Sequence, residues 1–586
     1  MALYSDPKLV AYRQAVNPVP ASYWLWPLYG AGLENLGVND QPIEVTLPAC
    51  GPDQILVRHD AVGLCFSDTK VIKAGETHPR LAGRDMKAEP VVLGHEVTLT
   101  VVQVGDDWKD RFHPGERFLV QADIYKDGVG MAYGYRLQGG LSQYNLVGPE
   151  VLDGDDGCYL LPVQQETGYA QAALTEPWAC ILASYTIDYR VGWKPGGAAL
   201  IVTGPGASGE YELGTPYGGG QPPARVVTVG VSGALQQELE AQAAARGFSL
   251  VAFGAVNEDN LADVVAASGQ DAFDDLVLLG PSSAQYELLE HSAAKGAVIN
   301  VVGAQALDKS TKVDVGRIHY DAISVVGTDG KLIADGYRAV RTELTAGGKA
   351  LFVGAAGPMG QMHVQRALQA ENGPAIMVST DLAKERMDVL TEKYAALIEA
   401  KRKADDVQFL VPGEDGFPAF NAAIMAATNG EGYDDIVVMA PSAGVVAGSV
   451  SQLANNGVMN IFAGLPRGTM AALDIGVVAT RGIRFTGTSG SGISDMRLML
   501  DAAESGGLDP NLSVVAVSGF RGAKEGLDGV VHQAFPGKVV IFPQILDFPL
   551  TRLSDLKNTL PNVYAKLGPN ESWTIQAEEQ FLKELL

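Results

Sequence analysis

Cysteine and long apolar segments are both scarce in this chain. Only four cysteines occur among 586 residues, and no two of them form a CxxC pair. This pattern excludes a disulfide framework and a structural zinc cluster built from closely spaced thiolates. No run of about 18 apolar residues occurs, and residues 1–20 contain charges and prolines where a signal peptide needs an unbroken apolar stretch. We therefore expect a cytoplasmic protein that does not span a membrane.

Positive charge is also in short supply. The chain has 43 Lys and Arg against 68 Asp and Glu, which gives a formal net charge of −25. Nucleic acids and anionic membranes both bind clustered Lys and Arg, so neither is an expected partner. The apolar fraction of 47% indicates a globular protein. A chain of this length is too long for one hydrophobic core and is expected to form about three or four domains.

Two short motifs contain ligand types that zinc accepts. Cys65 is followed by Phe-Ser-Asp, and His95-Glu96 follows Leu-Gly 30 residues later (95 − 65 = 30). Glu176, in a Thr-Glu-Pro-Trp segment, offers a further carboxylate. A catalytic zinc site uses three such ligands and leaves a fourth position for water or substrate. A buried cysteine beside a structural histidine is the alternative, but the two motifs lie at the ends of strand-like runs and precede a nucleotide-binding signature, which favours the metal site.

The chain changes character near Pro195. From about Gln54 to Val147, short apolar and polar runs alternate and are interrupted by Gly and Pro, the pattern of a small β-barrel. Beyond Pro195, strand-like runs alternate with Ala-rich helical segments such as 234–245 and 381–400. That alternation is typical of doubly wound α/β domains.

The α/β part contains an internal repeat. The segment 274–282 matches 434–442 at an offset of 160 (434 − 274 = 160), and Gly327 matches Gly487 at the same offset. A period this long indicates a duplicated domain, because solenoid repeats have periods of about 20 to 50 residues. We therefore expect two Rossmann-type domains in tandem.

The second copy has the features of a dinucleotide site. A strand-like run, 349–353, leads into a glycine-rich turn and a helical pattern. Such glycines let the backbone approach a pyrophosphate, which the free amides of the helix bind. Asp381 ends the next strand, where a carboxylate accepts hydrogen bonds from the ribose and repels a 2′-phosphate. We expect NAD to be bound by Gly354, Gly357, Pro358, Met359, Gly360, Asp381 and Thr488.

The first copy lacks most of these features. Glycines are present at Gly204 and Gly206, but residues 210–220 contain too many Gly and Pro to form a helix. Its next strand, 225–231, ends near Ser232 and not at an acidic residue. We expect a structural or interaction domain that binds no cofactor.

These motifs resemble those of the zinc-dependent medium-chain dehydrogenases, the family of alcohol, polyol and threonine dehydrogenases. The resemblance implies an α/β fold, in which a GroES-like β-barrel catalytic domain accompanies two tandem, doubly wound parallel-sheet domains. Members often carry a four-cysteine zinc lobe, but residues 105–140 contain no cysteine, so one zinc per chain is expected. The implied domains are 1–190 (catalytic, completed by 498–550), 191–345 (degenerate Rossmann), 346–497 (NAD-binding Rossmann) and 551–586 (helical tail).

The resemblance also implies roles for single residues. Ser67 passes the substrate proton outward, and Asp68 orients the zinc-bound imidazole. Glu96 and Glu176 complete the zinc site directly or through water. The implied catalytic set is Ser67, Asp68 and Glu96, and the implied metal set is Cys65, His95, Glu96 and Glu176.

The expected function is hydride transfer between NAD and a secondary alcohol or ketone. The Cys-Phe-Ser-Asp form, the Glu-Pro pair and residues 537–541 are similar to sorbitol dehydrogenase and sorbose-1-phosphate reductase-like proteins, which favours a polyol, sugar or sugar phosphate. A homo-oligomer is expected. A basic group between the two zinc motifs is able to hold a substrate phosphate, although an ordinary solvated loop explains it better; its members are His78, Arg80, Arg84 and Lys87.

Two other functions stay open. Zinc and NAD also serve transient oxidation within an elimination or an epimerisation, which produces no net NADH. A NAD-responsive scaffold is the third possibility, with the first Rossmann copy and the helical tail 572–586 binding a partner. Intact Cys65, Ser67 and His95 argue against the scaffold, because a protein that has lost its activity has no need of a relay hydroxyl beside two metal ligands.

Overall fold

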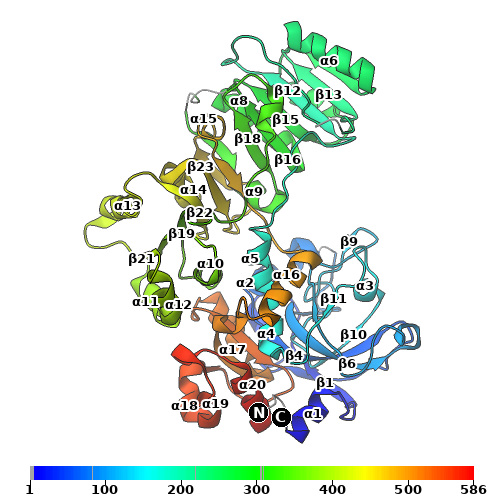
Figure 1. Cartoon of the computed structure of the whole chain (residues 1–586). Helices are drawn as coiled ribbons and strands as arrows, with labels where there is room; N and C mark the ends of the chain where they lie inside the picture. The colour runs from blue at the N-terminus through cyan, green and yellow to red at the C-terminus, as the bar shows by residue number, and fades with distance from the viewer. Residues whose placement is uncertain (1–5, 82, 218–219, 304–306, 308) are drawn as a thin grey trace.

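The structure is a computed structural model that describes residues 6–81, 83–217, 220–303, 307 and 309–586. It contains an eight-stranded mixed sheet and a twelve-stranded sheet, with helices packed around both. Figure 1 shows the eight-stranded sheet and both termini at the bottom, and the long sheet extending upward from there. The predicted α/β fold class is confirmed. No helix in the described ranges is long and apolar enough to cross a membrane.

The eight-stranded sheet combines the N-terminal and C-terminal parts of the chain. Antiparallel β4 and β6 place Gly63 opposite Glu96. The end of β4 therefore lies beside the start of β6, and the two zinc motifs, which follow and precede these strands, are brought together. In sheet order the strands are β11 (Leu160–Pro162), β7 (Arg117–Val120), β6 (Glu96–Val104), β4 (Ile55–Gly63), β27 (Lys538–Phe542), β26 (Val514–Gly519) and β28 (Thr551–Arg552), with β10 (Tyr144–Val147) on β4.

Helices complete this catalytic part. α2 begins directly after Cys65, and α5 carries Glu176 near its N-terminus. Helix α16 follows the second Rossmann copy and contacts α5, so the chain returns to the catalytic part at this point. The bounds are α1 (Pro7–Arg13), α2 (Phe66–Ala74), α3 (Pro149–Leu152), α4 (Tyr169–Ala173), α5 (Thr175–Ala183), α16 (Ile493–Glu504) and α17 (Ala523–Val531).

The first half of the twelve-stranded sheet is a parallel six-stranded sheet. Counted along the chain, its strands have the order 3-2-1-4-5-6, which is that of a dinucleotide-binding fold. They are β14 (Ser249–Phe253), β13 (Arg225–Val229), β12 (Ala198–Thr203), β15 (Phe273–Leu279), β16 (Ala293–Val302) and β18 (Ser324–Thr328). The helices are α6 (Gly233–Arg246), α7 (Leu261–Ala266), α8 (Ser283–Leu289) and α9 (Val315–Asp321).

The second half repeats this order. Its strands are β21 (Asp406–Leu410), β20 (Ile376–Thr380), β19 (Lys349–Val353), β22 (Tyr433–Val438), β23 (Leu453–Ile461) and β25 (Arg484–Thr486). Its helices are α10 (Pro358–Gln369), α11 (Lys384–Lys393), α12 (Ala395–Arg402), α13 (Gly416–Ala426), α14 (Ala443–Ser449) and α15 (Val477–Thr480). The single helical segment predicted for 381–400 is two helices, which meet at Tyr394.

The two copies meet with approximate twofold symmetry. The sixth strands pair antiparallel at Val325 and Phe485, which are 160 residues apart (485 − 325 = 160). Strands β17 (Thr311–Asp314) and β24 (Met470–Leu473) pair antiparallel as well, with Thr311 opposite Leu473 and Val313 opposite Ala471. Ala471 is the repeat counterpart of Thr311, and Leu473 is the repeat counterpart of Val313. Exchanging the two copies therefore turns one pair into the other, which is the pattern of an isologous contact. The duplicated segments form an internal pseudo-dimer.

The repeated glycines lie at this contact. A Cβ atom on Gly487 would lie 3.0 Å from the Cα atom of His319 in α9, and one on Gly327 would lie 3.2 Å from the backbone nitrogen of Ala479 in α15. His319 and Ala479 are themselves 160 residues apart. Each glycine therefore allows the helix of the other copy to approach the end of a sixth strand.

The first copy has lost the helix that normally follows the first strand. After β12, the described residues 204–217 and 220–224 contain no helix. Tyr211, Leu213 and Tyr217 instead pack on the sheet beside Ile201 and Leu279. The loop thus fills with side chains the region where a dinucleotide-binding fold carries its phosphate-binding helix.

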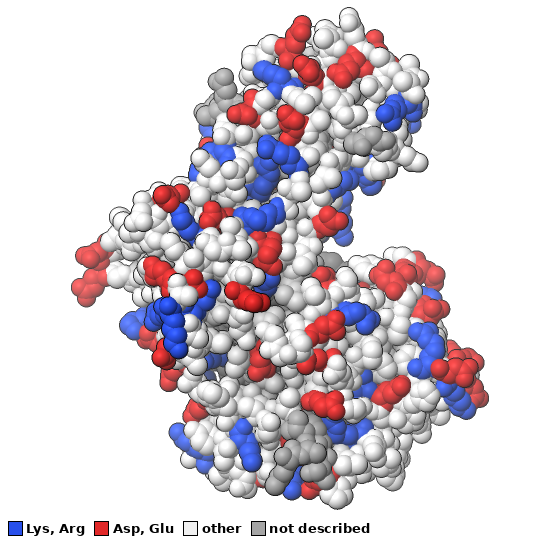
Figure 2. Space-filling view, in the orientation of Figure 1, with Lys and Arg blue, Asp and Glu red and all other residues white. Residues whose placement is uncertain are grey.

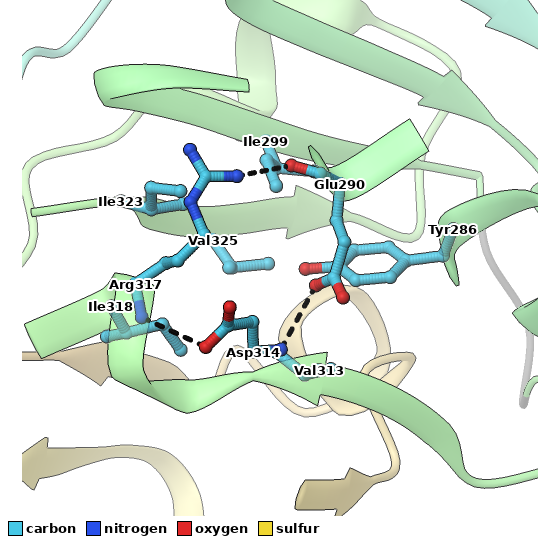
Figure 3. Close-up of a pocket in the computed structure, with 9 residues that line it drawn as sticks. All are labelled: Tyr286, Glu290, Ile299, Val313, Asp314, Arg317, Ile318, Ile323 and Val325. Atoms are coloured by element: carbon cyan, nitrogen blue, oxygen red, sulfur yellow. Dashed lines mark hydrogen bonds between the residues drawn. The ribbon is translucent and has the colours of Figure 1, made fainter. Parts of the chain in front are cut away.

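A buried polar cluster fixes α9 in the first copy (Figure 3). Asp314 caps the helix by accepting a hydrogen bond from the Arg317 amide at 3.3 Å, and its other oxygen accepts one from Gly468 of the second copy at 2.7 Å. Glu290 accepts from the Asp314 amide, and Arg317 donates to the Glu290 carbonyl at 2.9 Å. The helix is therefore tied to both copies.

The C-terminal tail belongs to the catalytic part. Trp573 and Phe581, which lie before and within α20 (Ile575–Leu585), are buried with Phe542 of β27. Glu578 accepts hydrogen bonds from the first two amides of α4, at Tyr169 and Ala170. A carboxylate is favoured at a helix N-terminus because it faces free N–H groups. The apolar face of α20 is therefore already covered.

The visible surface carries both signs of charge. Figure 2 shows Lys and Arg interspersed among Asp and Glu on the face that it presents.

Glu290 is expected to make stability depend on pH. Burial, with a contribution from Asp314, raises the pKa of this carboxyl to about 8, and one of its oxygens has no described hydrogen-bond partner. The folded state therefore holds a proton that the unfolded chain releases, and stability is lost as the pH rises from about 4.5 to 8. Glu290→Gln removes this loss and should raise the free energy of unfolding relative to wild type at pH 9 by up to a few kcal/mol, with little difference at pH 5. Urea unfolding at the two pH values measures this change as a shift in midpoint. Exposed Glu258→Gln is the control; equal pH profiles for wild type and Glu290→Gln would contradict the assignment.

Candidate functional site

The two zinc motifs meet at one end of the eight-stranded sheet. Cys65 is the residue before α2 and His95 is the residue before β6. Ligand atoms of Cys65, His95 and Glu96 all lie within 4.8 Å of one another. Among the described residues these form a possible metal-binding group, and a thiolate, an imidazole and a carboxylate are all zinc ligands.

Ser67 and Asp68 contact both of the first two ligands. Ser67 Oγ lies 3.0 Å from Cys65 Sγ and 3.1 Å from His95 Nε2. Asp68 Oδ1 lies 3.2 Å from His95 Nδ1, while Oδ2 accepts a hydrogen bond from the Cys65 amide at 3.0 Å. The carboxylate thus holds the imidazole by one nitrogen and leaves Nε2 facing the thiol. This is the arrangement that supports a metal-bound histidine.

Glu96 has one oxygen bound and one oxygen free. The first accepts a hydrogen bond from Lys538 of β27, and Oε2 is buried without a described hydrogen-bond partner. A buried, unpaired carboxylate oxygen is costly, and a metal ion at the Cys65–His95–Glu96 group would remove the cost. Burial opposes the charge on Lys538, but the charge and hydrogen bond of Glu96, together with Cys65 and Glu176, raise the pKa of Lys538 above its ordinary value. The residues present therefore fit a zinc ion.

Glu176 lies near this group but outside it. Burial raises its pKa to about 7, while His95 lowers it and Glu96 raises it further, so the three groups are close enough to interact. Cys180 lies one turn further along α5 and is half-buried. Burial raises the pKa of its thiol, and charge on Glu176 adds to that effect. Glu176 therefore lies close to the metal-binding group, although its carboxylate is not among the ligand atoms that lie within 4.8 Å of one another.

The basic residues between the motifs divide into different roles. Arg84 donates to the carbonyl oxygens of Glu89, Pro90 and Arg136 and so holds the loop together. Arg80 pairs with Asp123 and lies over the ring of Tyr135, 5.1 Å from its centroid.

Tyr135 connects this loop to the metal-binding group. Its ring contacts His95 at 5.8 Å and His78 at 5.6 Å between centroids. His78 and His95 thus contact the same ring. Lys87 is exposed, and only its backbone amide makes a described hydrogen bond. His78 and Arg80 therefore contact Tyr135, which in turn contacts His95. Arg84 bonds only backbone carbonyl oxygens of its own region among the described residues.

The glycine turn of the second copy has the predicted shape. Gly354 has a positive φ of 83°, and a Cβ atom on Gly360 would lie 2.5 Å from the Gly354 carbonyl oxygen. Gly357 precedes α10, whose first residue is Pro358. A Cβ atom on Gly357 would have no neighbour closer than 4.0 Å. The turn is therefore open on the side of the helix N-terminus, where a pyrophosphate binds in such folds.

Asp381 lies at the end of β20 beside this turn. Its side chain accepts hydrogen bonds from the amides of Ala356 and Ala383, at 3.2 and 3.1 Å. Arg386 pairs with the same carboxylate at 2.7 Å. Met359 and Thr488 are half-buried, Met359 in the first turn of α10 and Thr488 just beyond β25.

Sequence reasoning did not single out Lys538, Tyr135 or Cys180. Lys538 belongs to the segment 537–541, which supports the sequence-based prediction only through its family resemblance. A lysine at the start of an apolar strand-like run nevertheless indicates a buried cation that needs a carboxylate partner. Tyr135 lies in a loop, and its contact with His95 depends on tertiary structure that no local pattern specifies.

Parts of the chain are similar in sequence to known proteins. Residues 51–152 match the alcohol dehydrogenase GroES-like domain. Uncharacterized protein YggP of Escherichia coli is 29% identical over 320 residues, covering 51% of this chain and 73% of that protein. Mannitol-1-phosphate 5-dehydrogenase of Aliivibrio fischeri is 26% identical, covering 49% and 71%. L-sorbose 1-phosphate reductase of Klebsiella pneumoniae is also 26% identical, covering 50% and 74%. The resemblance predicted from the motifs is thus confirmed: the chain carries an alcohol dehydrogenase GroES-like domain and is related to the polyol- and sugar-phosphate dehydrogenases.

Proposed function

We propose that the chain is a zinc- and NAD-dependent oxidoreductase that interconverts a secondary alcohol and a ketone. The observation that carries this proposal is the buried Glu96 oxygen without a hydrogen-bond partner beside Cys65 and His95. The open glycine turn of the second Rossmann copy supplies the second requirement, a dinucleotide site. The family relationship supports both.

Cys65, His95 and Glu96 are the proposed zinc ligands, and Glu176 acts from beside them, directly or through water. A zinc ion held there lowers the pKa of an alcohol and polarises a ketone. The glycine turn of the second copy and Asp381 would hold NAD, which would supply or accept the hydride. The first copy, which lacks the phosphate-binding helix, binds no dinucleotide in this proposal.

The remaining residues position ligands and move the proton. Asp68 keeps His95 oriented through Nδ1, and Lys538 holds one oxygen of Glu96. Ser67 Oγ lies beside both Cys65 and His95 and is half-exposed. In alcohol oxidation it accepts the proton that the substrate hydroxyl releases and passes it outward, and in ketone reduction it returns one.

The proposed substrate is a polyol or a sugar, in phosphorylated form. Two relatives are named for mannitol 1-phosphate and sorbose 1-phosphate. Both compounds combine a secondary alcohol or ketone with a phosphate monoester.

Direct assay tests the proposal. Full-length protein should produce NADH from D-mannitol 1-phosphate or D-sorbitol 6-phosphate, or consume it with L-sorbose 1-phosphate, as followed by absorbance. A zinc chelator should abolish the rate and added zinc should restore it. A chelator-insensitive rate would contradict the role of zinc, and failure with all three compounds would contradict the proposed substrate class. A product formed from them without net NADH would instead favour transient oxidation.

One zinc ion per chain is expected, bound through Cys65. Metal analysis after dialysis should find one zinc in wild type and close to none in Cys65→Ala, because loss of one of three ligands removes most of the affinity. Cys158→Ala provides a matched control, since Cys158 is a half-buried cysteine outside the group. Two zinc ions per chain, or one retained by Cys65→Ala, would show that the site is misassigned.

Asp381 is expected to set the preference for NAD. Asp381→Asn keeps a side-chain acceptor for one of the two neighbouring amides, removes the charge and releases Arg386, which then pairs with a 2′-phosphate. The ratio of kcat/KM for NAD to that for NADP should fall by about tenfold or more, because the loss of one hydrogen bond to a charged group changes binding by about that factor. Asp388→Asn, an exposed position in α11, should leave the ratio unchanged. Equal use of both cofactors by wild type would refute this role.

A further inference from the structure

The first Rossmann copy reaches the ligand-binding edge of the second. A Cβ atom on Gly464, just beyond β23, would lie 3.2 Å from the Tyr320 hydroxyl of α9, and one on Gly487, just beyond β25, would lie 3.0 Å from His319. Ligands of open α/β sheets bind outside the carboxyl ends of the strands. Helix α9 of the first copy therefore lies at the carboxyl ends of β23 and β25, the edge at which the second copy would bind a dinucleotide (Figure 1).

Lys70 reaches the same place from the catalytic part. Its Nζ atom would lie 3.9 Å from the same Cβ position on Gly464. Lys70 is exposed in α2, three residues after Ser67, and side chains at that spacing share one face of a helix. Lys70 thus extends from the proton-relay residue toward Tyr320. Given the two distances to Gly464, Lys70 Nζ and Tyr320 Oη are at most 7.1 Å apart (3.2 + 3.9 = 7.1).

Lys70 is a cation without a carboxylate partner among the described residues. Its charge contributes, after burial, to the lowered pKa values of His78 and His319, so both rings lie within its field. The nearby Arg80 is neutralised by Asp123. Lys70 is therefore a positive charge near His78 and His319 that no described carboxylate neutralises.

Tyr320 is held in place but has a free hydroxyl. Arg467 donates to the Tyr320 carbonyl oxygen at 3.4 Å, pairs with Asp321 at 2.8 Å and lies 5.2 Å from the centroid of the Tyr320 ring. The polar cluster around Asp314 fixes the start of the same helix. No described residue hydrogen-bonds to the half-buried Tyr320 hydroxyl.

We propose that Lys70 Nζ and Tyr320 Oη bind the phosphate group of the substrate, so that the first copy contributes to substrate specificity. Hydrogen bonds of about 2.7 to 2.9 Å from each group to different phosphate oxygens span this separation. This inference rests on the proposed function, because it assigns the end of the substrate that lies away from the reacting carbon. It gives the copy that lacks the dinucleotide features a direct task.

The test compares phosphorylated and unphosphorylated substrates of the full-length, zinc-loaded protein with NAD. The quantity measured is the ratio of kcat/KM for D-mannitol 1-phosphate to that for D-mannitol. Lys70→Met should lower the ratio about tenfold or more, the value of a charged hydrogen bond, and Tyr320→Phe should lower it about threefold. The loss should appear mainly in KM for the phosphorylated compound.

Two matched variants serve as controls. Lys73→Met changes another exposed lysine of α2, and Tyr564→Phe removes another half-buried phenol hydroxyl, far from the cleft in the C-terminal part. Both should keep the wild-type ratio. An equal loss for both substrates in Lys70→Met or Tyr320→Phe, or an equal change in a control, would overturn the proposal.

Calorimetric titration with inorganic phosphate separates this proposal from the proposed function. Wild type should bind phosphate, and Lys70→Met should weaken binding about tenfold. Unchanged binding in Lys70→Met, or none in wild type, refutes the phosphate site even if alcohols are oxidised. Lysine-dependent binding without turnover of any substrate supports the site and refutes the oxidoreductase.

Discussion

The pairing of β4 with β6 is the constraint on which the site depends. It places Gly63 opposite Glu96, and a side chain on Gly63 would collide with Glu96 Oε2 and with Leu174. Only a glycine lets the carboxylate turn toward the thiol and the imidazole. Lys538 then joins the pair from a strand that the chain reaches 442 residues after Glu96. The hydrogen bond that holds one oxygen of Glu96 is therefore made only when the C-terminal segment has joined the sheet.

The order of elements and the two zinc motifs were accessible from the sequence because each depends on local patterns. Glycines before a helix and an acid after a strand are recognised from neighbouring residues. The long repeat is recognised by comparing the sequence with itself. The residues that sequence reasoning missed act across the fold. Lys538 meets Glu96, and Tyr320 meets Gly464, only through the tertiary arrangement. The repeat showed that two copies exist, but no local pattern could show that their sixth strands pair.

That pairing gives the two copies different surroundings at equivalent positions. At one end of the symmetric contact, α9 of the first copy lies over Gly487, next to the cleft of the second. At the other end, α15 lies over Gly327, next to a turn already filled by Tyr211 and Tyr217. Lys70 of the catalytic part reaches Gly464 of the second copy. The first copy thus lacks the helix after its first strand in the described residues, while its α9 still packs against its neighbour.

The internal pseudo-dimer has a further consequence for how the protein responds to dilution. Two separate subunits with this contact would dissociate as their concentration falls. Here both halves belong to one chain, so their encounter is intramolecular and does not depend on the protein concentration. The support that α9 gives to the second copy is therefore independent of how much protein is present, and the chain remains intact at concentrations where a symmetric dimer would separate into halves.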